Sequence, residues 1–237
     1  MAIIQPFKGY LPSSEMANKI SSPPYDILSS DEARKIVFNN HDSFLRVIKP
    51  QIDFPAETNM GGDTIHKHGA KILQNFINEG RLQQDNNRCF YIYKISMGHH
   101  SQTGVVAAVS ISEYNKGYIK KHELTRSAKE DDRTRHIEVI NANTGPVFLI
   151  FRDNGMLKST IDACIKKDPI ISFTAENGTT HNLWKIDSSN HLSQIADYFK
   201  TIPALYIADG HHRAAAASRV QKIREDSNFQ HKGDEAY

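Results

Sequence analysis

The pattern of apolar and polar positions is most regular between Asp63 and Asn78, where apolar residues recur at the spacing of one helix face. Gly80 follows this run and is a typical residue just beyond a helix, because glycine adopts a left-handed backbone at little cost. The pattern predicts an amphipathic helix with one face against the core. The apolar side chains on that face are Ala70, Leu73, Phe76 and Ile77.

Runs rich in β-branched and aromatic residues predict strands around this helix. Arg88–Met97 and Thr103–Tyr114 are joined by Gly98-His99-His100, which indicates a hairpin. The other predicted strands are Phe44–Lys49, Ile119–Glu123, Val147–Phe151, Ile170–Thr174, Leu183–Ile186 and the apolar run that ends at Asp209. The other predicted helices are Glu32–Asn39, Lys129 to about Asn143, Lys158–Ile165 and His191–Phe199. Ser30 and Asp31 mark the start of the first, and Gly145-Pro146 ends the second, which is highly charged.

Three segments lack such patterns. Residues 1–28 are punctuated by proline and glycine and contain the rigid run Ser21-Ser22-Pro23-Pro24-Tyr25-Asp26. Because proline removes backbone donors and favours extended geometry before it, we expect this segment to be irregular and to wrap over a surface. Pro50–Gly62 is expected to be a loop, and Asn228–Tyr237 has no packing pattern of its own.

The order of the predicted elements favours an α+β (mixed α/β) fold, a mixed sheet flanked by helices, over a regular doubly wound sheet. Antiparallel hairpins dominate the middle of the chain, while helices and strands alternate in its second half. With 237 residues the chain is long enough to bury a substantial core. We expect one mixed α/β region over residues 1–237, with a sub-boundary near residues 80–88.

Composition and charge narrow the classes of partner. The 29 basic and 27 acidic residues give a net charge of +2, so neither nucleic acid nor a membrane is expected as a partner. Cys89 and Cys164 follow no metal or redox spacing, and no stretch approaches the roughly 20 apolar residues of a membrane-spanning helix. These observations predict a soluble cytoplasmic protein in which any anion-binding site is local.

The most informative polar sequence is Asp209-Gly210-His211-His212-Arg213, which follows a buried strand and opens a helix at His211 or Arg213. A glycine turn at a helix start leaves several backbone N–H groups pointing at one spot, and the helix dipole adds about half a positive charge there. Gly210 allows a ligand to approach closely, while Arg213 and a histidine can donate to phosphate oxygens. The turn therefore predicts a phosphate-binding site.

Two other interpretations of this turn stay open at the level of sequence. Asp209 could simply cap the helix, with both histidines on the surface. Asp209, His211 and His212 are also metal-ligand residue types. Adjacent histidines at a helix start diverge, however, and no further ligand stands at metal spacing, so no metal site is predicted.

A second polar cluster begins at the end of the predicted strand Ile119–Glu123. A scaffold can aim Glu123 from there into a cleft as a general base. Arg126, Arg133 and His136 can neutralise phosphate charge, and the last two share a helix face. The alternative is a solvated helix laced with ion pairs. That alternative fits three residues of the cluster better: Asp131, Asp132 and Arg135.

Taken together, five motifs resemble a prokaryotic family catalogued as domain-of-unknown-function family 1015. They occur in the family's order and span nearly the whole chain. The motifs are Ser22-Pro23-Pro24-Tyr25-Asp26, His122-Glu123-x-Thr125, Glu130-Asp131-Asp132-Arg133, Pro146-Val147-Phe148-Leu149 and Tyr206-Ile207-Ala208-Asp209-Gly210-His211-His212-Arg213. Members of that family are longer, so the resemblance implies that this chain is the N-terminal portion.

The Asp209–Arg213 turn also resembles the G-x-H-R phosphate box of the ParB/sulfiredoxin-like group, which includes kinases acting on free serine. The resemblance implies that Gly210, His211, His212 and Arg213 hold nucleotide phosphates, and Asp209 belongs to the same turn. His211 stands where sulfiredoxin has its cysteine, which argues against sulfinic-acid repair. Glu123 and His212 are the candidate catalytic residues, with Glu123 as the base on grounds of chemistry and location.

The leading hypothesis is a nucleotide-dependent phosphotransferase that uses ATP or ADP with Mg²⁺ on a small hydroxyl-bearing molecule such as free serine. Positioning and charge neutralisation supply most of the catalysis in such reactions, which suits a cleft rich in Arg and His with one base. One alternative is a nucleotide-binding regulatory protein of ParB type without phosphotransfer. The other is a phosphohydrolase that uses the same anion site.

Overall fold

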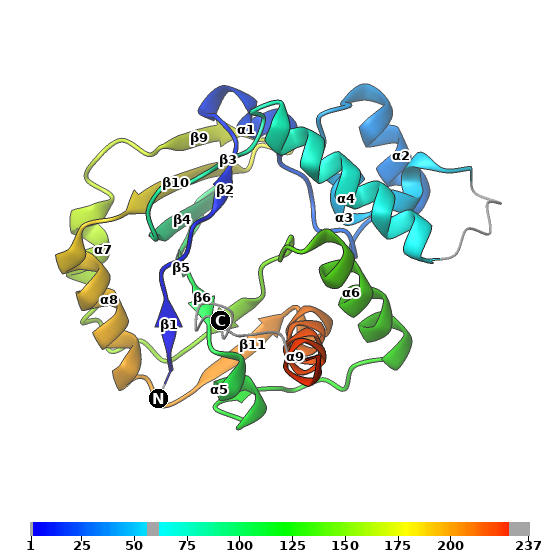
Figure 1. Ribbon diagram of the computed structural model, residues 1–237. Coiled ribbons are helices and arrows are strands. Elements are labelled where there is room, and N and C mark those ends of the chain that lie inside the picture. Colours follow the sequence, from blue (N-terminus) through cyan, green and yellow to red (C-terminus); the bar gives the residue numbers. More distant parts are fainter. Residues whose placement is uncertain (1, 56–61, 228–237) are drawn as a thin grey trace.

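A computed structural model describes residues 2–55 and 62–227 of the chain, and Figure 1 shows their arrangement. The expected α+β class is confirmed, because helices surround several small sheets of which one is mixed. The patternless segment at 228–237 and part of the expected loop before residue 62 lie outside the described residues.

The largest sheet has four antiparallel strands in the order β5-β4-β10-β9. β4 and β5 form the predicted hairpin, in which Gly98 has φ of +58°. β5 ends well before Tyr114, because Ser110 Oγ accepts the Glu113 backbone N–H at 3.3 Å and starts a helix, α5, in place of the longer predicted strand. The strands of this sheet are β4 Phe90–Met97, β5 His100–Val106, β9 Ile171–Thr174 and β10 Thr180–Ile186.

A second sheet of three strands has the order β7-β11-β8, with β11 parallel to β7 and antiparallel to β8. It is the mixed sheet of the fold, and β11 is its central strand. The strand predicted over Ile119–Glu123 is shorter than expected, so Glu123 lies in the irregular segment after it. The strands of this sheet are β7 Ile119–Lys120, β8 Phe148–Ile150 and β11 Leu205–Asp209.

The N-terminal segment is more regular than its prolines suggest. Two short strands within it pair with distant partners, β1 with β6 and β2 with β3, and a helix follows them. Residues 1–28 are therefore not irregular throughout, although 21–28 contain no helix or strand. The elements involved are β1 Ile4–Gln5, β2 Tyr10–Leu11, β3 Gln83–Gln84, β6 Ala108–Val109 and α1 Ser14–Ile20.

The expected helices form with small shifts at their ends. Ser29 caps α2, and its side chain and that of Glu32 make a reciprocal capping box. The charged helix α6 ends earlier than expected, because Asn141 takes the left-handed conformation with φ of 55°. The helices are α2 Ser30–Asn39, α4 Gly62–Asn78, α5 Ile111–Asn115, α6 Ser127–Ile140, α7 Lys158–Cys164, α8 Ser189–Thr201 and α9 His211–Asp226.

The strand predicted over Phe44–Lys49 is wrong, since α3 (Leu45–Ile48) and a 3₁₀ turn (Pro50–Asp53) occupy this region. Its apolar run is buried on several sides rather than on one sheet face. Carbonyl groups that a strand would have paired with a neighbour are met by side chains of α6. His136 donates to Val47 and Arg133 donates to Ile48.

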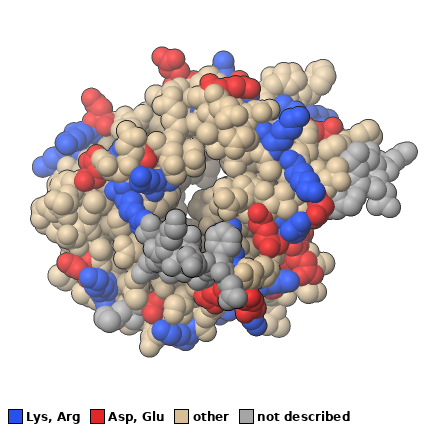
Figure 2. All heavy atoms as spheres, viewed as in Figure 1, with Lys and Arg blue, Asp and Glu red and all other residues tan. Residues whose placement is uncertain are grey.

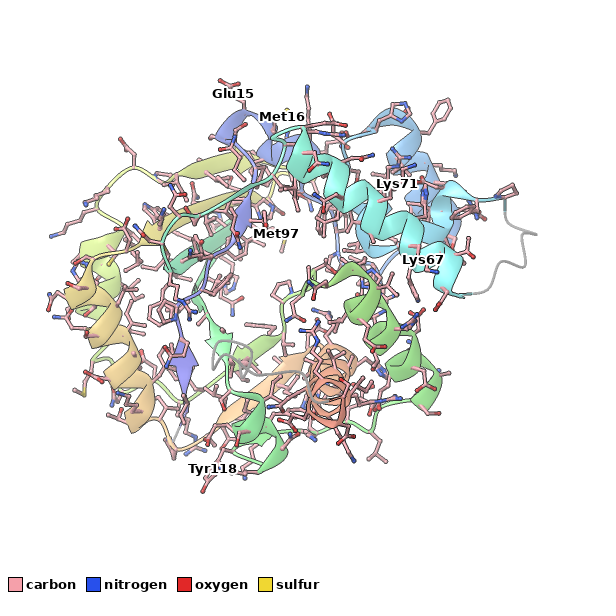
Figure 3. All side chains as sticks on the ribbon, viewed as in Figure 1. Glu15, Met16, Lys67, Lys71, Met97 and Tyr118 are labelled. Carbon is pink, nitrogen blue, oxygen red and sulfur yellow. The ribbon has the colours of Figure 1, made fainter. Side chains whose placement is uncertain are left out.

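Apolar side chains of the described residues form three buried clusters, of which the smallest joins α2 and α3 and the other two are larger. One joins both sheets to α8, and Phe90, Ile195 and Ile207 lie at its centre. The other lies beneath α4, where the four predicted face residues of that helix either are buried or pack against the buried cluster. Figure 2 shows the surface hollowed near its middle, and Figure 3 places the exposed side chain of Met97 beside this opening.

Replacing Phe76 with alanine tests the second core. Phe76 is 1% exposed, and the Arg81 guanidinium lies 4.2 Å from its ring centre. We expect Phe76→Ala to lower the free energy of unfolding by about 3–5 kcal/mol. Phe38→Ala is the matched control, because Phe38 is 82% exposed and should change stability by no more than about 0.5 kcal/mol. Urea denaturation measures both, and equal effects would contradict this core.

Candidate functional site

The central strand β11 leads through Gly210 directly into α9, as the sequence predicted. Gly210 has φ of +96°, a region that other residues enter only at a cost, and α9 begins at His211. Ala215 and Ala216 are buried and bring α9 close to its neighbours. Because Gly210 has no side chain to cap the helix, the first backbone N–H groups of α9 remain directed at the space beyond the strand end.

A pocket of about 170 Å³ lies at this helix start. Its walls combine carboxylates, cations and imidazoles and come from three separate parts of the chain. The lining residues are Tyr25, Asp26, Glu123, Lys129, Asp209, Gly210, His211, His212 and Arg213. The structure thus brings Glu123 to the Asp209–Arg213 turn, as expected, although Asp209 follows Glu123 by 86 positions in the sequence.

Arg213 spans the pocket wall. Its guanidinium donates to Asp209 Oδ2 at 2.7 Å, to the Pro146 carbonyl and, at 3.4 Å, to Asp26 Oδ2. The side chain is only 13% exposed. Instead of pointing freely into the pocket, as a phosphate ligand would, this arginine ties together the ends of three segments.

His211 is the most buried polar side chain of the pocket, at 5% exposure. Its Nδ1 lies 3.5 Å from Glu123 Oε2, and the His122 ring meets it edge-on with ring centres 4.5 Å apart. Burial lowers the pKa of His211, and the neighbouring His122 lowers it further, while Glu123 opposes the shift. His211 is therefore neutral near pH 7.

The predicted phosphate ligands on and before α6 do not line this pocket. His136 is 2% exposed and donates to the Val47 carbonyl at 3.0 Å. Arg133 donates to the Ile48 carbonyl at 3.2 Å and stacks over the Tyr25 ring at 4.3 Å, so it reaches the pocket only through Tyr25. Arg126 is exposed at the start of α6.

Sequence reasoning assigned no role to Tyr25, Asp26 or Lys129, which line the pocket, or to Lys49 behind them. Lys49 is buried and donates to the carbonyls of Tyr25 and Leu28 at 3.1 and 2.5 Å, and burial lowers its pKa. The rigid Ser22–Asp26 run signalled a fixed backbone. Only the three-dimensional arrangement shows that buried cations hold this backbone against the turn.

Side chains in the described ranges do not form a metal site by themselves. No group of three or more histidine, cysteine, aspartate or glutamate side chains within 2–55 and 62–227 is arranged to hold a metal ion. Within the same ranges, no helix is both long and apolar enough to cross a bilayer.

Comparison with known proteins identifies the family but not the activity. The family model described as "Protein of unknown function (DUF1015)" matches residues 4–237, so the chain belongs to this family. No significant match was found among curated proteins or solved structures.

Gly210→Ala tests the turn. An added Cβ would be strained at φ of +96° and would lie 3.3 Å from the Val147 Cα and from the Arg213 guanidinium. Gly98→Ala is the matched control, since Gly98 also has positive φ, at +58°, but nothing lies within 4 Å of its added Cβ. We expect about 1–2 kcal/mol of destabilisation from the strain alone in the control and a larger loss at Gly210. Urea unfolding that gave equal losses would contradict the close contact.

The buried His136 predicts a pH dependence of stability. Burial lowers its pKa to about 4 from an ordinary 6.5. As the pH falls the unfolded chain takes up this proton first, so the stabilisation is complete above about pH 6.5 and is lost towards pH 4, by up to roughly 3 kcal/mol. In urea denaturation, His136→Gln should reduce the change in the free energy of unfolding between these pH values. The substitution His99→Gln, at an exposed position, should not. An unchanged slope in His136→Gln would refute the assignment.

Proposed function

We propose that this member of the DUF1015 family is a nucleotide-dependent phosphotransferase acting on a small hydroxyl-bearing molecule, with the pocket at the start of α9 as its phosphate site. The observation that carries the proposal is the uncapped start of α9, which opens into a polar pocket beside Lys129, His211 and His212. Unpaired N–H groups at a helix start attract anions, and the helix dipole adds to the attraction. The likeness of this turn to the ParB/sulfiredoxin-like phosphate box supports the same proposal.

The size of the pocket favours binding of the phosphate end of a nucleotide. At about 170 Å³ it is smaller than the roughly 300–1,000 Å³ of pockets that enclose a whole small-molecule ligand. A phosphate group fits this volume, and the sugar and base then extend beyond it. Lys129, at the N-terminal end of α6, is placed to meet phosphate charge without first leaving an ion pair with Asp26 or Asp209, as Arg213 would.

ATP or ADP would bring Mg²⁺ with it. Mg²⁺ in nucleotide sites is held by one or two carboxylates together with phosphate oxygens, so a dedicated protein cage is not needed. Asp209 and Glu123 line the pocket and are 62% and 61% exposed, which leaves their oxygens accessible. Asp209 fits the role of a Mg²⁺ ligand, and the ion would offset phosphate charge.

The transferred group needs an acceptor hydroxyl and a group that takes its proton. Glu123 and His212, the two candidates from the sequence, both line the pocket. Free serine is the acceptor that the resemblance to serine kinases suggests. A regulatory protein that binds nucleotide without transfer, or a phosphohydrolase, would use the same anion site. Product analysis after incubation with ATP, Mg²⁺ and serine, and separately with phosphoserine, distinguishes the three.

Nucleotide binding is the first test. At about 100 times its dissociation constant, a ligand that binds only the folded state adds about 2.7 kcal/mol, or roughly 5–10 °C in Tm for a chain of this size. We expect this rise with ATP or ADP plus Mg²⁺, and we expect Lys129→Ala to reduce it. Lys166→Ala is the control, because Lys166 is an exposed lysine outside the pocket lining.

Two results would count against the proposal. A Tm that does not move with millimolar nucleotide would exclude the phosphate site. An equal loss of stabilisation in Lys129→Ala and Lys166→Ala would place the nucleotide elsewhere. Arg213→Ala is less suitable as a first variant, because its contacts with Asp26, Pro146 and Asp209 hold the pocket wall.

A further inference from the structure

Three aromatic rings are aligned on one face of the four-stranded sheet. Phe173 of β9 stacks on His181 of β10, with ring centres 4.8 Å apart and ring planes inclined by 20°. His181 in turn stacks on Tyr93 of β4, at 6.0 Å and 17°. Its Nδ1 lies 2.5 Å from the Tyr93 hydroxyl, and the hydrogen bond between them fixes the two rings relative to each other. The rings therefore form an ordered row across three strands.

This row lies on the face of the sheet that is turned away from α8. Side chains alternate between the two faces of a strand, so Tyr93 and Met97 of β4 share one face. Phe90 and Ile92 point to the other face, into the core that includes Ile195 of α8. The exposed side chain of Met97 lies beside the hollow at the centre of the molecule (Figure 3). The row of rings thus belongs to the side of the sheet that borders this hollow.

The row ends at a glycine. Gly104 of β5 is directly opposite Tyr93 in the antiparallel pair of β4 and β5. Since β5 and β10 flank β4 on its two sides, Gly104 lies on the side of Tyr93 that His181 leaves uncovered. A Cβ built on Gly104 would have no atom of the described residues within 4 Å. Among the described rings, only that of His181 stacks on Tyr93, so the row stops at an open space over Gly104.

The fold itself does not require glycine at this position. Glycine in the middle of a strand is destabilising, because it loses more conformational freedom on folding than any other residue. Gly104 does not take a positive φ, and the register of β4 and β5 runs without a bulge. Its surroundings are open, so close packing does not require it either. The remaining usual reason for a glycine within a strand is a ligand that approaches the backbone closely.

The side chains around the open space indicate the chemistry of such a ligand. Gln102 and Val106 stand two positions from Gly104 on β5 and share its face. Gln102 is exposed, and its amide can both donate and accept hydrogen bonds at the edge of a ring. Lys185, on the same face of β10, is in an ion pair with Asp85 at 2.5 Å. This neutral setting suits an uncharged planar ring and offers no free cation to a phosphate.

We propose that the space over Gly104 binds an uncharged nitrogen heteroaromatic ring of the purine class, which stacks on Tyr93 and adds a fourth ring to the row. Stacked rings attract one another, and an aromatic side chain stacks on any base because every base has a π-face. A purine also has nitrogen atoms at its edge, which the Gln102 amide can meet. The site shares no residue with the lining of the anion pocket at the start of α9, and it does not depend on the proposed phosphotransfer.

Adenosine is the probe for this site, because it presents a purine without a phosphate. We expect saturation-transfer NMR of the full chain with millimolar adenosine to show transfer to the protons of the base, and a titration to give the dissociation constant. Tyr93→Leu should raise that constant by about 5- to 150-fold, which corresponds to the loss of one base–aromatic stack. Thr103→Val is the matched control on β5 and should leave it unchanged, because Thr103 is exposed and points to the opposite face.

Gly104→Val separates ligand binding from folding. Valine fills the open space and suits a strand better than glycine, so the Tm should stay the same or rise. Adenosine binding should weaken by about tenfold or more, because the space beside Tyr93 is then occupied. A lower Tm would contradict the open space. Undiminished adenosine binding in this variant, or no saturation transfer in the unaltered protein, would overturn the site.

ATP with Mg²⁺ shows where the ring comes from. If Gly104→Val weakens ATP and adenosine binding by the same factor, the base of a bound nucleotide occupies the site. If the variant weakens adenosine binding alone, the ring belongs to a separate nucleoside or base. Both results support the site. Because adenosine carries no phosphate, its binding is decided independently of the pocket at the start of α9, and a failure of ATP to bind would remove the proposed function alone.

Discussion

The site depends on one cation that is shared among three segments. Arg213 on α9 donates to Asp209 at the end of β11, to the Pro146 carbonyl ahead of β8 and to Asp26 in the N-terminal segment. Two glycines pack closely against it: a Cβ on Gly145 or Gly210 would lie 3.1 or 3.3 Å from its side chain, so that side chain would have to shift to admit one. The two glycines and the arginine therefore form one packing unit, and the backbone geometry at the start of α9 follows from it.

Behind this unit, buried polar side chains donate hydrogen bonds to backbone carbonyls of short or irregular segments. Lys49 donates to the carbonyls of residues 25 and 28, and Arg133 and His136 donate to those of α3. Unpaired buried carbonyls are costly, so side-chain donors from other elements can fix such segments firmly. Such donors are the same residue types that bind phosphate. Their residue types alone therefore cannot distinguish a side chain that holds the scaffold from one that meets a ligand.

Because residue type does not distinguish these two roles, only part of the fold and of the site could be predicted from the sequence. The helix Gly62–Asn78, the hairpin after Phe90 and the strand–turn–helix at Gly210 follow from periodicity and glycine placement, which are local properties. The α3 region could not be predicted, because its carbonyl partners on α6 lie more than 80 residues away. At the site, Glu123 and the turn were named from the sequence and do line the same pocket, whereas the contributions of Tyr25, Asp26 and Lys129 depend on contacts between distant segments.

The charge balance of the pocket determines which of its groups can attract an anion. Asp26 and Asp209 already neutralise Arg213, and His211 is neutral near pH 7 because burial lowers its pKa. The positive potential that remains is that of Lys129 and of the backbone N–H groups at the start of α9. Backbone donors are fixed by the fold and cannot be exchanged by side-chain substitution. An anion site built on them depends on the shape of the Gly210 turn, and the side chains around it are then available for orientation and proton transfer.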